Sequence, residues 1–207
     1  MTESGDRGGA APTPQPRQTP QARLSSDLGP RAASSVVMVA AALTTLWLGG
    51  DVFILFWLGC ALALHWEWQR IIGAPQDKAR YFIGGAFIVV AVALLRLAMI
   101  ESAFLVVAAG AAVLAFLGGP GKRLWAGAGL IYAASVVISV TLLRVLSRID
   151  GVEAIIWLFA VVWGTDVMAY FGGRLIGGPK LWPRLSPSKT WAGFLVGVFS
   201  GGLLGVL

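Results

Sequence analysis

Residues 163–193 hold most of the side chains in this sequence that could do chemistry. Glycines let a backbone approach a phosphate closely, cations neutralise phosphate charge, and a carboxylate can hold a Mg²⁺ ion that bridges phosphate oxygens. The segment therefore predicts a site for a phosphate-bearing substrate with a divalent cation. Its one carboxylate is Asp166, and it is followed by Gly172, Gly173, Arg174, Gly177, Gly178, Lys180, Arg184, Ser186, Ser188, Lys189 and Thr190.

Asp166 lies inside an otherwise apolar run, from Ala154 to Gly173. A carboxylate in a membrane span is costly unless it faces a polar cavity, a cation or a basic partner. Tyr170 and Arg174 follow at i+4 and i+8, on roughly the same helix face. Two interpretations stay open, a structural ion pair between Asp166 and Arg174 and a Mg²⁺ ligand. A plain basic loop with turn residues would explain the charge after Gly173, but not the clustering of glycines and hydroxyls beside a carboxylate.

The composition places these residues in a membrane protein. Of 207 residues, 57% are hydrophobic and 13% charged, against about 45–50% and about 25% in a soluble domain. A water-soluble monomer is therefore excluded. The single cysteine, Cys60, excludes a disulfide framework and a thiolate metal site. The net charge of +6 indicates membrane topology and contact with anionic lipid, and no nucleic-acid partner is expected.

Uncharged stretches of suitable length predict an all-α, polytopic transmembrane bundle of about seven spans. Residues 1–31 hold five of the ten prolines and predict a disordered tail, and residues 32–207 form the transmembrane domain. The second and third stretches are short and are expected to extend past Glu67 and back to Arg80. The stretches are Ala32–Gly50, Val52–Trp66, Tyr81–Leu95, Ser102–Gly121, Leu124–Leu143, Ala154–Gly173 and Thr190–Leu207.

Basic residues set the orientation. With the N-terminus in the cytoplasm, 13 of the 16 Lys and Arg residues fall on the inside and three, Arg96, Arg144 and Arg148, on the outside. The loop 172–190 is then cytoplasmic, where nucleotides are. The inside ends of the spans also carry the tryptophans of an interfacial belt, namely Trp66, Trp68, Trp125, Trp182 and Trp191.

Two stretches carry a resemblance to a known family. Asp-x-x-Ala-Tyr-Phe-x-Gly-Arg at 166–174 and Ser-Pro-x-Lys-Thr-Trp-x-Gly at 186–193 resemble the phosphatidate cytidylyltransferase family. The resemblance implies a bacterial-type inner-membrane enzyme that transfers a cytidylyl group from CTP to phosphatidate, releases pyrophosphate and requires Mg²⁺. Ser188 and Ala192 stand where many members carry Lys and Glu. The family also predicts a further C-terminal portion, with the remaining metal ligands, beyond Leu207.

The resemblance and the residue types together suggest roles. Asp166 would hold Mg²⁺ and act with Lys189 and Arg174 as the catalytic group. Triphosphate or lipid headgroup would be bound by Tyr170, Gly173, Lys180, Arg184, Ser186 and Thr190. A CTP-dependent polyprenol kinase and a non-enzymatic transporter remain as alternatives, although no internal repeat of a transporter is visible. The glycines at 193, 197, 201 and 205 predict a stripe that packs against a neighbouring span or forms a homodimer seam.

Overall fold

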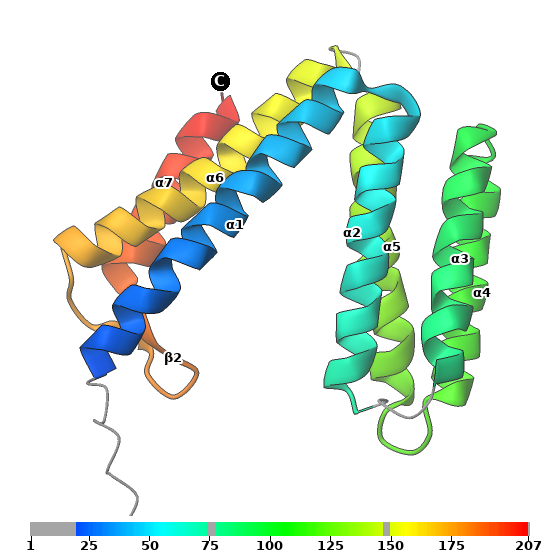
Figure 1. Ribbon diagram of the computed structural model, residues 1–207, viewed down its shortest axis with the longest axis horizontal. Coiled ribbons are helices and arrows are strands. Elements are labelled where there is room, and N and C mark those ends of the chain that lie inside the picture. The colour runs from blue at the N-terminus through cyan, green and yellow to red at the C-terminus, as the bar shows by residue number, and fades with distance from the viewer. Residues whose placement is uncertain (1–19, 74–77, 147–149, 207) are drawn as a thin grey trace, which may run out of the picture. The chain divides into compact units, whose positions relative to one another are not determined.

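The computed structural model describes residues 20–73, 78–146 and 150–206 of the chain. These residues form a helical protein with one small hairpin, as the sequence predicted for the fold class (Figure 1). In chain order the elements are α1 (Pro20–Leu48), α2 (Gly50–Ile71), α3 (Lys78–Arg96), α4 (Ile100–Leu117), α5 (Arg123–Leu146), α6 (Gly151–Leu175), β1 (Lys180–Trp182), β2 (Ser186–Thr190) and α7 (Trp191–Val206).

The number of full-length spans is lower than the predicted seven. Among the described residues, five helices, α2 to α6, are long and apolar enough to cross a membrane. The first and last predicted spans correspond to shorter apolar helices, Ala33–Leu48 and Trp191–Val206. The extension of the second and third spans is confirmed, because α2 continues to Ile71 and α3 starts at Lys78.

The chain divides into two compact units, residues 1–43 and 44–207. The first unit contains most of α1, which begins at Pro20. Residues 20–31, which the sequence placed in a disordered tail, are therefore helical. Residues such as Gln21, Ala22, Arg23 and Leu24 are good helix formers, and adding turns to an existing apolar helix needs no new nucleus. The remainder of the predicted tail, residues 1–19, lies outside the described residues.

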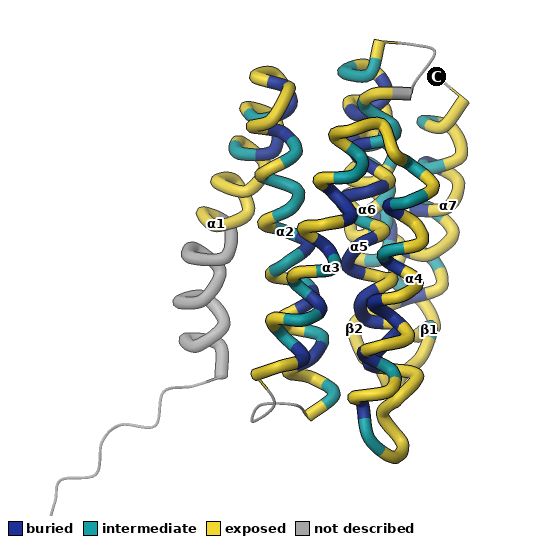
Figure 2. The backbone as a smooth tube through the Cα atoms, turned by 90° about the vertical axis from the view of Figure 1, so that its right-hand side faces the viewer, coloured by how far each residue is buried: buried dark blue, intermediate teal, exposed yellow. Residues whose placement is uncertain are grey.

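Helices α2 to α5 form a four-helix bundle within the second unit. Helix α3 packs beside α4, α4 beside α5, and α2 beside both α5 and α3 (Figure 1). Figure 2 shows the buried residues of these helices alternating with exposed ones along each helix. The exposed positions include large apolar side chains such as Phe116 and Leu124. Such a surface suits lipid rather than water.

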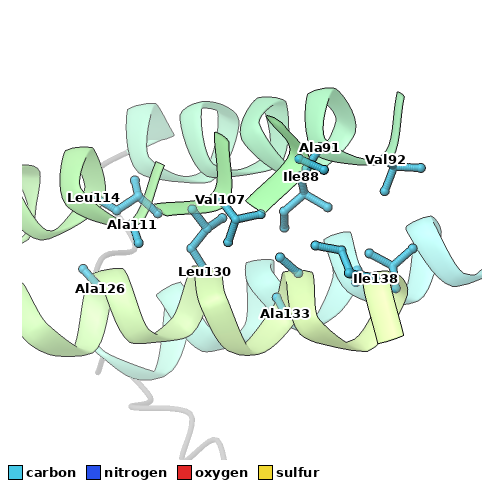
Figure 3. Packing of buried hydrophobic residues seen from close by; sticks show 14 residues of the cluster. Ile88, Ala91, Val92, Val107, Ala111, Leu114, Ala126, Leu130, Ala133 and Ile138 are labelled. Atoms are coloured by element: carbon cyan, nitrogen blue, oxygen red, sulfur yellow. The ribbon is translucent and has the colours of Figure 1, made fainter. Parts of the chain in front are cut away.

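Half of the core of this bundle is alanine, and the other half is valine, leucine and isoleucine (Figure 3). A Cβ atom at Gly127 would lie 2.7 Å from the carbonyl oxygen of Ala111, so α5 approaches the backbone of α4 directly. Small residues allow such close approach between membrane helices. The buried cluster consists of Ala61, Ile88, Ala91, Val92, Ala103, Val107, Ala111, Leu114, Ala126, Leu130, Ala133, Ala134, Val137 and Ile138.

Helix α7 packs along α6 through its glycine stripe. A Cβ atom at Gly193 would lie 2.7 Å from the carbonyl oxygen of Ala169, and one at Gly197 would lie 2.9 Å from the Cβ of Ala169. A Cβ atom at Gly201 would meet the side chain of Thr165. The prediction that the stripe packs against a neighbouring span is confirmed for these three glycines. At Gly205 a Cβ would meet no described atom within 4 Å.

The loop between α6 and α7 contains an antiparallel hairpin that the sequence analysis did not predict. Lys180 pairs with Thr190, and Trp182 with Ser186. The N–H of Leu185 donates to the carbonyl oxygen of Trp182 at 3.1 Å and closes the turn. Pro183 stands at the second position of this turn, which favours proline. That placement was the available sequence signal.

Candidate functional site

A cavity of about 640 Å³ lies between α6, the hairpin and α7. All three elements belong to the second unit. Six of the nine predicted site residues line this cavity, and Asp166, Arg184 and Ser186 do not. The six are Tyr170, Gly173, Arg174, Lys180, Lys189 and Thr190.

Helix α6 presents Tyr170 and Arg174 to the cavity from successive turns. Arg174 Nη1 donates a hydrogen bond to Tyr170 Oη at 2.8 Å, and both side chains are exposed. The phenol therefore holds the guanidinium along the helix, at the cavity wall. Within the described part of α6, Arg174 pairs with Tyr170 and not with Asp166. The structural ion pair considered from the sequence is thus not formed.

Thr190 joins the hairpin to α7. It is buried, and its Oγ1 accepts a hydrogen bond at 3.2 Å from the N–H of Gly193. This is an N-cap contact, which satisfies one of the free N–H groups in the first turn of α7. Gly173 makes room for it, because a Cβ there would lie 3.0 Å from Thr190 Oγ1. The hydroxyl hydrogen of Thr190 can still be donated to a ligand.

The hairpin supplies two of the cations. Lys180 and Lys189 are both exposed and line the cavity together with Arg174. No Asp or Glu stands among the described residues of the wall. The first turn of α7, also free of acidic residues, adds the positive end of its helix dipole. Three cations and a helix N-terminus around one cavity suit a polyanion such as a triphosphate.

Asp166 is exposed on α6, next in sequence to Thr165, which lines the cavity. Among the residues that the structure describes, no three His, Cys, Asp or Glu side chains gather to hold a metal ion. A lone carboxylate fits Mg²⁺, which keeps several waters and is usually bound through one or two carboxylates and substrate phosphates. It does not fit a cage made of protein ligands. Arg184 is exposed in the hairpin turn, and Ser186 is half-buried at the start of β2.

Several wall residues were missed from the sequence. Thr165 adds a hydroxyl to that of Ser188, which the sequence had already indicated, and Leu181, Phe194 and Val198 make part of the wall apolar. The hydroxyl of Thr165 donates to the carbonyl oxygen of Val161 at 2.6 Å. Helical spacing could have found some of these positions, since Thr165 precedes Ala169 by four residues and Phe194 precedes Val198 by four. The cavity wall is therefore apolar in one part and cationic in another.

Comparison with known proteins identifies the family to which this chain belongs. Residues 30–207 match the model of the Cytidylyltransferase family. The chain is 40% identical over 185 residues to a phosphatidate cytidylyltransferase of Brucella abortus, a match that covers 86% of this chain and 67% of that protein. It is 32% identical over 181 residues to a phosphatidate cytidylyltransferase of Pseudomonas aeruginosa, covering 81% of this chain and 65% of the other.

The matched region is therefore about two thirds of the length of these relatives. A shorter match, 47% identical over 49 residues, is to a phosphatidate cytidylyltransferase of Rickettsia bellii. No solved structure matches the chain. With a family model that covers most of the sequence and relatives of 40% identity, the chain belongs to the Cytidylyltransferase family.

Proposed function

We propose that this protein transfers a cytidylyl group from CTP to phosphatidate and forms CDP-diacylglycerol. The observation that carries the proposal is the cavity lined by Arg174, Lys180 and Lys189, which lies in a chain whose relatives are named phosphatidate cytidylyltransferase. Both substrates bear phosphate, and phosphatidate also bears acyl chains. A wall that is cationic in one part and apolar in another suits this pair of substrates.

In the reaction, a phosphate oxygen of phosphatidate attacks the α-phosphorus of CTP. The bond from this phosphorus to the oxygen that bridges to the β-phosphorus breaks, and pyrophosphate leaves. Such transfers need little covalent chemistry from the protein, so positioning and charge neutralisation provide most of the catalysis. Lys189, Lys180 and Arg174 would neutralise the phosphates, and Thr190 would donate a hydrogen bond from the N-cap of α7.

Mg²⁺ would supply further neutralisation of phosphate charge when bound with the nucleotide. Asp166 is the residue we propose to hold it, as the one carboxylate of residues 163–193. Tyr170 acts through Arg174, which it positions, and Gly173 acts by admitting Thr190. Arg184 and Ser186 do not line the cavity, and we assign them no direct contact with the reacting phosphates.

We also propose that the cavity opens to the cytoplasm from a bacterial inner membrane. The ends of α2 and α4 and the start of α5, in residues 66–81 and 118–126, hold five basic and two acidic residues. The opposite ends, in residues 48–52, 95–102 and 144–153, hold three basic and four acidic residues. Successive spans alternate in direction, so the end of α6 lies on the more basic side, which faces the cytoplasm.

The site test is incorporation of radiolabelled CTP into lipid by membranes that contain the protein. Lys189→Ala should lower turnover by about 10²–10³, the usual cost of one electrostatic contact to the transition state. Asp166→Asn keeps the size of the side chain but removes its charge, and should lower turnover similarly. Lys78→Ala is the matched control, because Lys78 is an exposed lysine at the start of α3 and outside the cavity wall. Near wild-type turnover in Asp166→Asn would reject the metal role.

The position of the label separates this activity from the kinase alternative. Cytidylyl transfer carries the α-phosphate of CTP into the lipid, whereas a kinase carries the γ-phosphate. We expect label from [α-³²P]CTP, and not from [γ-³²P]CTP, in the chloroform-soluble product. The reverse result would reject cytidylyl transfer and favour a lipid kinase at the same site.

The orientation is tested by cysteine labelling in intact cells, in a Cys60→Ala background. Ser188→Cys lies on the cavity wall and Ser4→Cys near the N-terminus of the sequence. Both should resist a membrane-impermeant maleimide until the cells are opened. Strong labelling of either cysteine in intact cells would contradict the N-terminus-in orientation.

A further inference from the structure

A second hollow lies at the end of the four-helix bundle, where α2 ends and α5 begins. Its volume is about 380 Å³, and its lining consists of Trp68, Ile71, Ile72, Lys122 and Trp125. None of these residues lines the cavity between α6, the hairpin and α7. The hollow is thus separate from the site of the proposed function, and it combines indole rings, aliphatic side chains and one ammonium group.

The Trp68 side chain is held in place by contacts within the bundle, and its ring centroid lies 6.5 Å from that of Trp125. Trp68 Nε1 donates a hydrogen bond to the carbonyl oxygen of Trp125 at 2.8 Å. The Trp68 ring lies against Gly129, where a Cβ atom would overlap the ring, and its centroid is 5.5 Å from that of Tyr132. This side of the hollow is therefore formed before any ligand arrives, and a ligand need not order it.

Lys122 is also positioned. Its Nζ donates a hydrogen bond at 3.2 Å to the carbonyl oxygen of Gly73, just beyond the end of α2. An ammonium group has three N–H donors, so two remain for another acceptor. Helix α5 begins at the next residue, Arg123, and has no acidic residue in its first turn. The ammonium and the positive end of this helix both favour an anion, and Arg123 adds a further positive charge at the next position in the sequence.

The position of the hollow relative to the membrane surface indicates the class of ligand. Spans α2 and α5 both reach the membrane–water boundary here, as Trp68 and Trp125 at their ends suggest. A ligand bound at this depth meets aliphatic and aromatic groups on one side and cations on the other. Basic pockets between transmembrane helices commonly bind anionic lipid headgroups.

We propose that this hollow binds an anionic phosphoglycerolipid. The phosphate lies at Lys122, beside the start of α5, and the glycerol and upper acyl chain lie against Trp68, Trp125 and Ile71. The excess of basic residues at this end, five against two acidic, matches the lipid's charge. A bound lipid would connect the end of α2 to the start of α5 on the outer surface of the bundle.

The test counts lipids retained by the intact protein in native mass spectrometry. The probes are phosphatidylglycerol and phosphatidylcholine with identical acyl chains, titrated separately into the detergent-purified protein. We expect saturable retention of phosphatidylglycerol in excess of phosphatidylcholine. Lys122→Ala should weaken phosphatidylglycerol retention about fivefold, as expected for one basic residue near a lipid headgroup. Lys122→Arg, which keeps the charge, should restore it.

Three further variants keep the test decisive. Lys78→Ala removes an exposed lysine at the same end of the bundle but outside the hollow, and should leave retention unchanged. Lys189→Ala removes a cation of the other cavity, and the loss caused by Lys122→Ala should persist in the Lys189→Ala background, which separates this hollow from that cavity. If Lys122→Ala does not fold, Arg123→Ala removes a neighbouring charge instead and should weaken retention. Equal retention of the two lipids by the wild type, or equal losses in Lys78→Ala and Lys122→Ala, would overturn the proposal.

Discussion

The α2–α5 bundle and the α6–hairpin–α7 unit are built from similar apolar helices but bury them to different degrees. In the most apolar 18 residues of α5, 56% are buried inside the protein, against 17% in α6. Helix α5 contacts three neighbouring bundle helices, whereas α6 packs mainly along α7. A helix that is surrounded on several sides has little surface left for ligands except at its ends. A helix that is packed along one seam keeps its other faces available for substrate, lipid or further protein.

Close contacts in the two regions also serve different purposes. In the bundle, Gly127 brings the backbone of α5 against the Ala111 carbonyl of α4, and the side chain nearest to this position is the methyl group of Ala115. Between α6 and α7, Gly173 and Gly193 bring the helices together beside the hydroxyl of Thr190. Glycine therefore allows close helix packing in the bundle core, whereas between α6 and α7 it makes room for the hydroxyl of Thr190 at the cavity wall.

The largest expected effect comes from filling the α6–α7 seam. Gly193→Leu would force a side chain against the Ala169 carbonyl oxygen, which a Cβ alone would approach to 2.7 Å. The helices must separate, and the cations of the cavity then shift relative to one another. A displacement of about 1 Å can cost about 10²-fold in rate, so CTP turnover should fall at least that much.

Gly202→Leu provides the matched control for this variant. It lies on the same helix and is exposed, and no described atom lies within 4 Å of the position that its Cβ would occupy. Turnover and thermal unfolding in detergent should remain near wild type. Equal losses in the two variants would mean that α7 does not pack against α6 through the Gly193 side.

The second expected effect lies in the bundle and concerns stability rather than turnover. Leu130 is fully buried between α4 and α5, so Leu130→Ala leaves a cavity and should cost about 2–5 kcal/mol in the free energy of unfolding. Turnover per folded molecule should be unchanged, because α5 contributes no residue to the cavity wall. Denaturant unfolding of Leu130→Ala is compared with that of Leu203→Ala, an exposed leucine of α7.

Much of the difference between the bundle and the α6–hairpin–α7 unit can be predicted from the sequence. The lengths of the apolar runs alone identify α2 to α6. The sequence also identifies the cationic segment, since no other loop combines glycines, hydroxyls and cations in this way. The exact lengths of the first and last spans do not follow from apolar runs. Thr190 begins the last apolar run, but it is the N-cap of α7 and not part of the helix. In α1 the helix extends into charged and polar residues before Ala33, which the composition had assigned to a tail.

Membership of the cavity wall could be predicted only in part. Helical spacing correctly groups Tyr170 with Arg174, but Asp166 shares that spacing and lies outside the wall. The seam with α7 runs along Thr165 and Ala169, so it is these positions that the cavity follows. The hairpin similarly separates Lys180 and Lys189, which face the cavity, from Arg184 at the turn.

A smaller effect is expected where the hairpin joins α7. Thr190→Ala removes the N-cap of α7, which should cost about 1 kcal/mol in stability. If the hydroxyl also donates to substrate, KM for CTP should rise as well, and Thr190→Ser should restore both quantities. Ser200→Ala is the control, because Ser200 Oγ bonds only to carbonyl oxygens of its own helix among the described residues. A stability loss without a change in KM would leave Thr190 a purely structural role.

The smallest expected effect is at the end of the bundle opposite the proposed lipid hollow. Asp51 and Arg96 form an ion pair with an Nη2 to Oδ1 distance of 2.6 Å, and their side chains are 66% and 55% exposed. Exposed pairs contribute about 0.2–1 kcal/mol, because water screens the charges and two long side chains lose freedom. Asp51→Asn should therefore change the free energy of unfolding by less than about 1 kcal/mol, and added salt should reduce the difference further. A double-mutant cycle with Arg96→Gln isolates the pair from its surroundings. A coupling energy of several kcal/mol would show that charge, rather than the apolar core, holds this end of α2 and α3 together. The contrast between an apolar α2–α5 bundle and a charged α6–hairpin–α7 site would then be too simple.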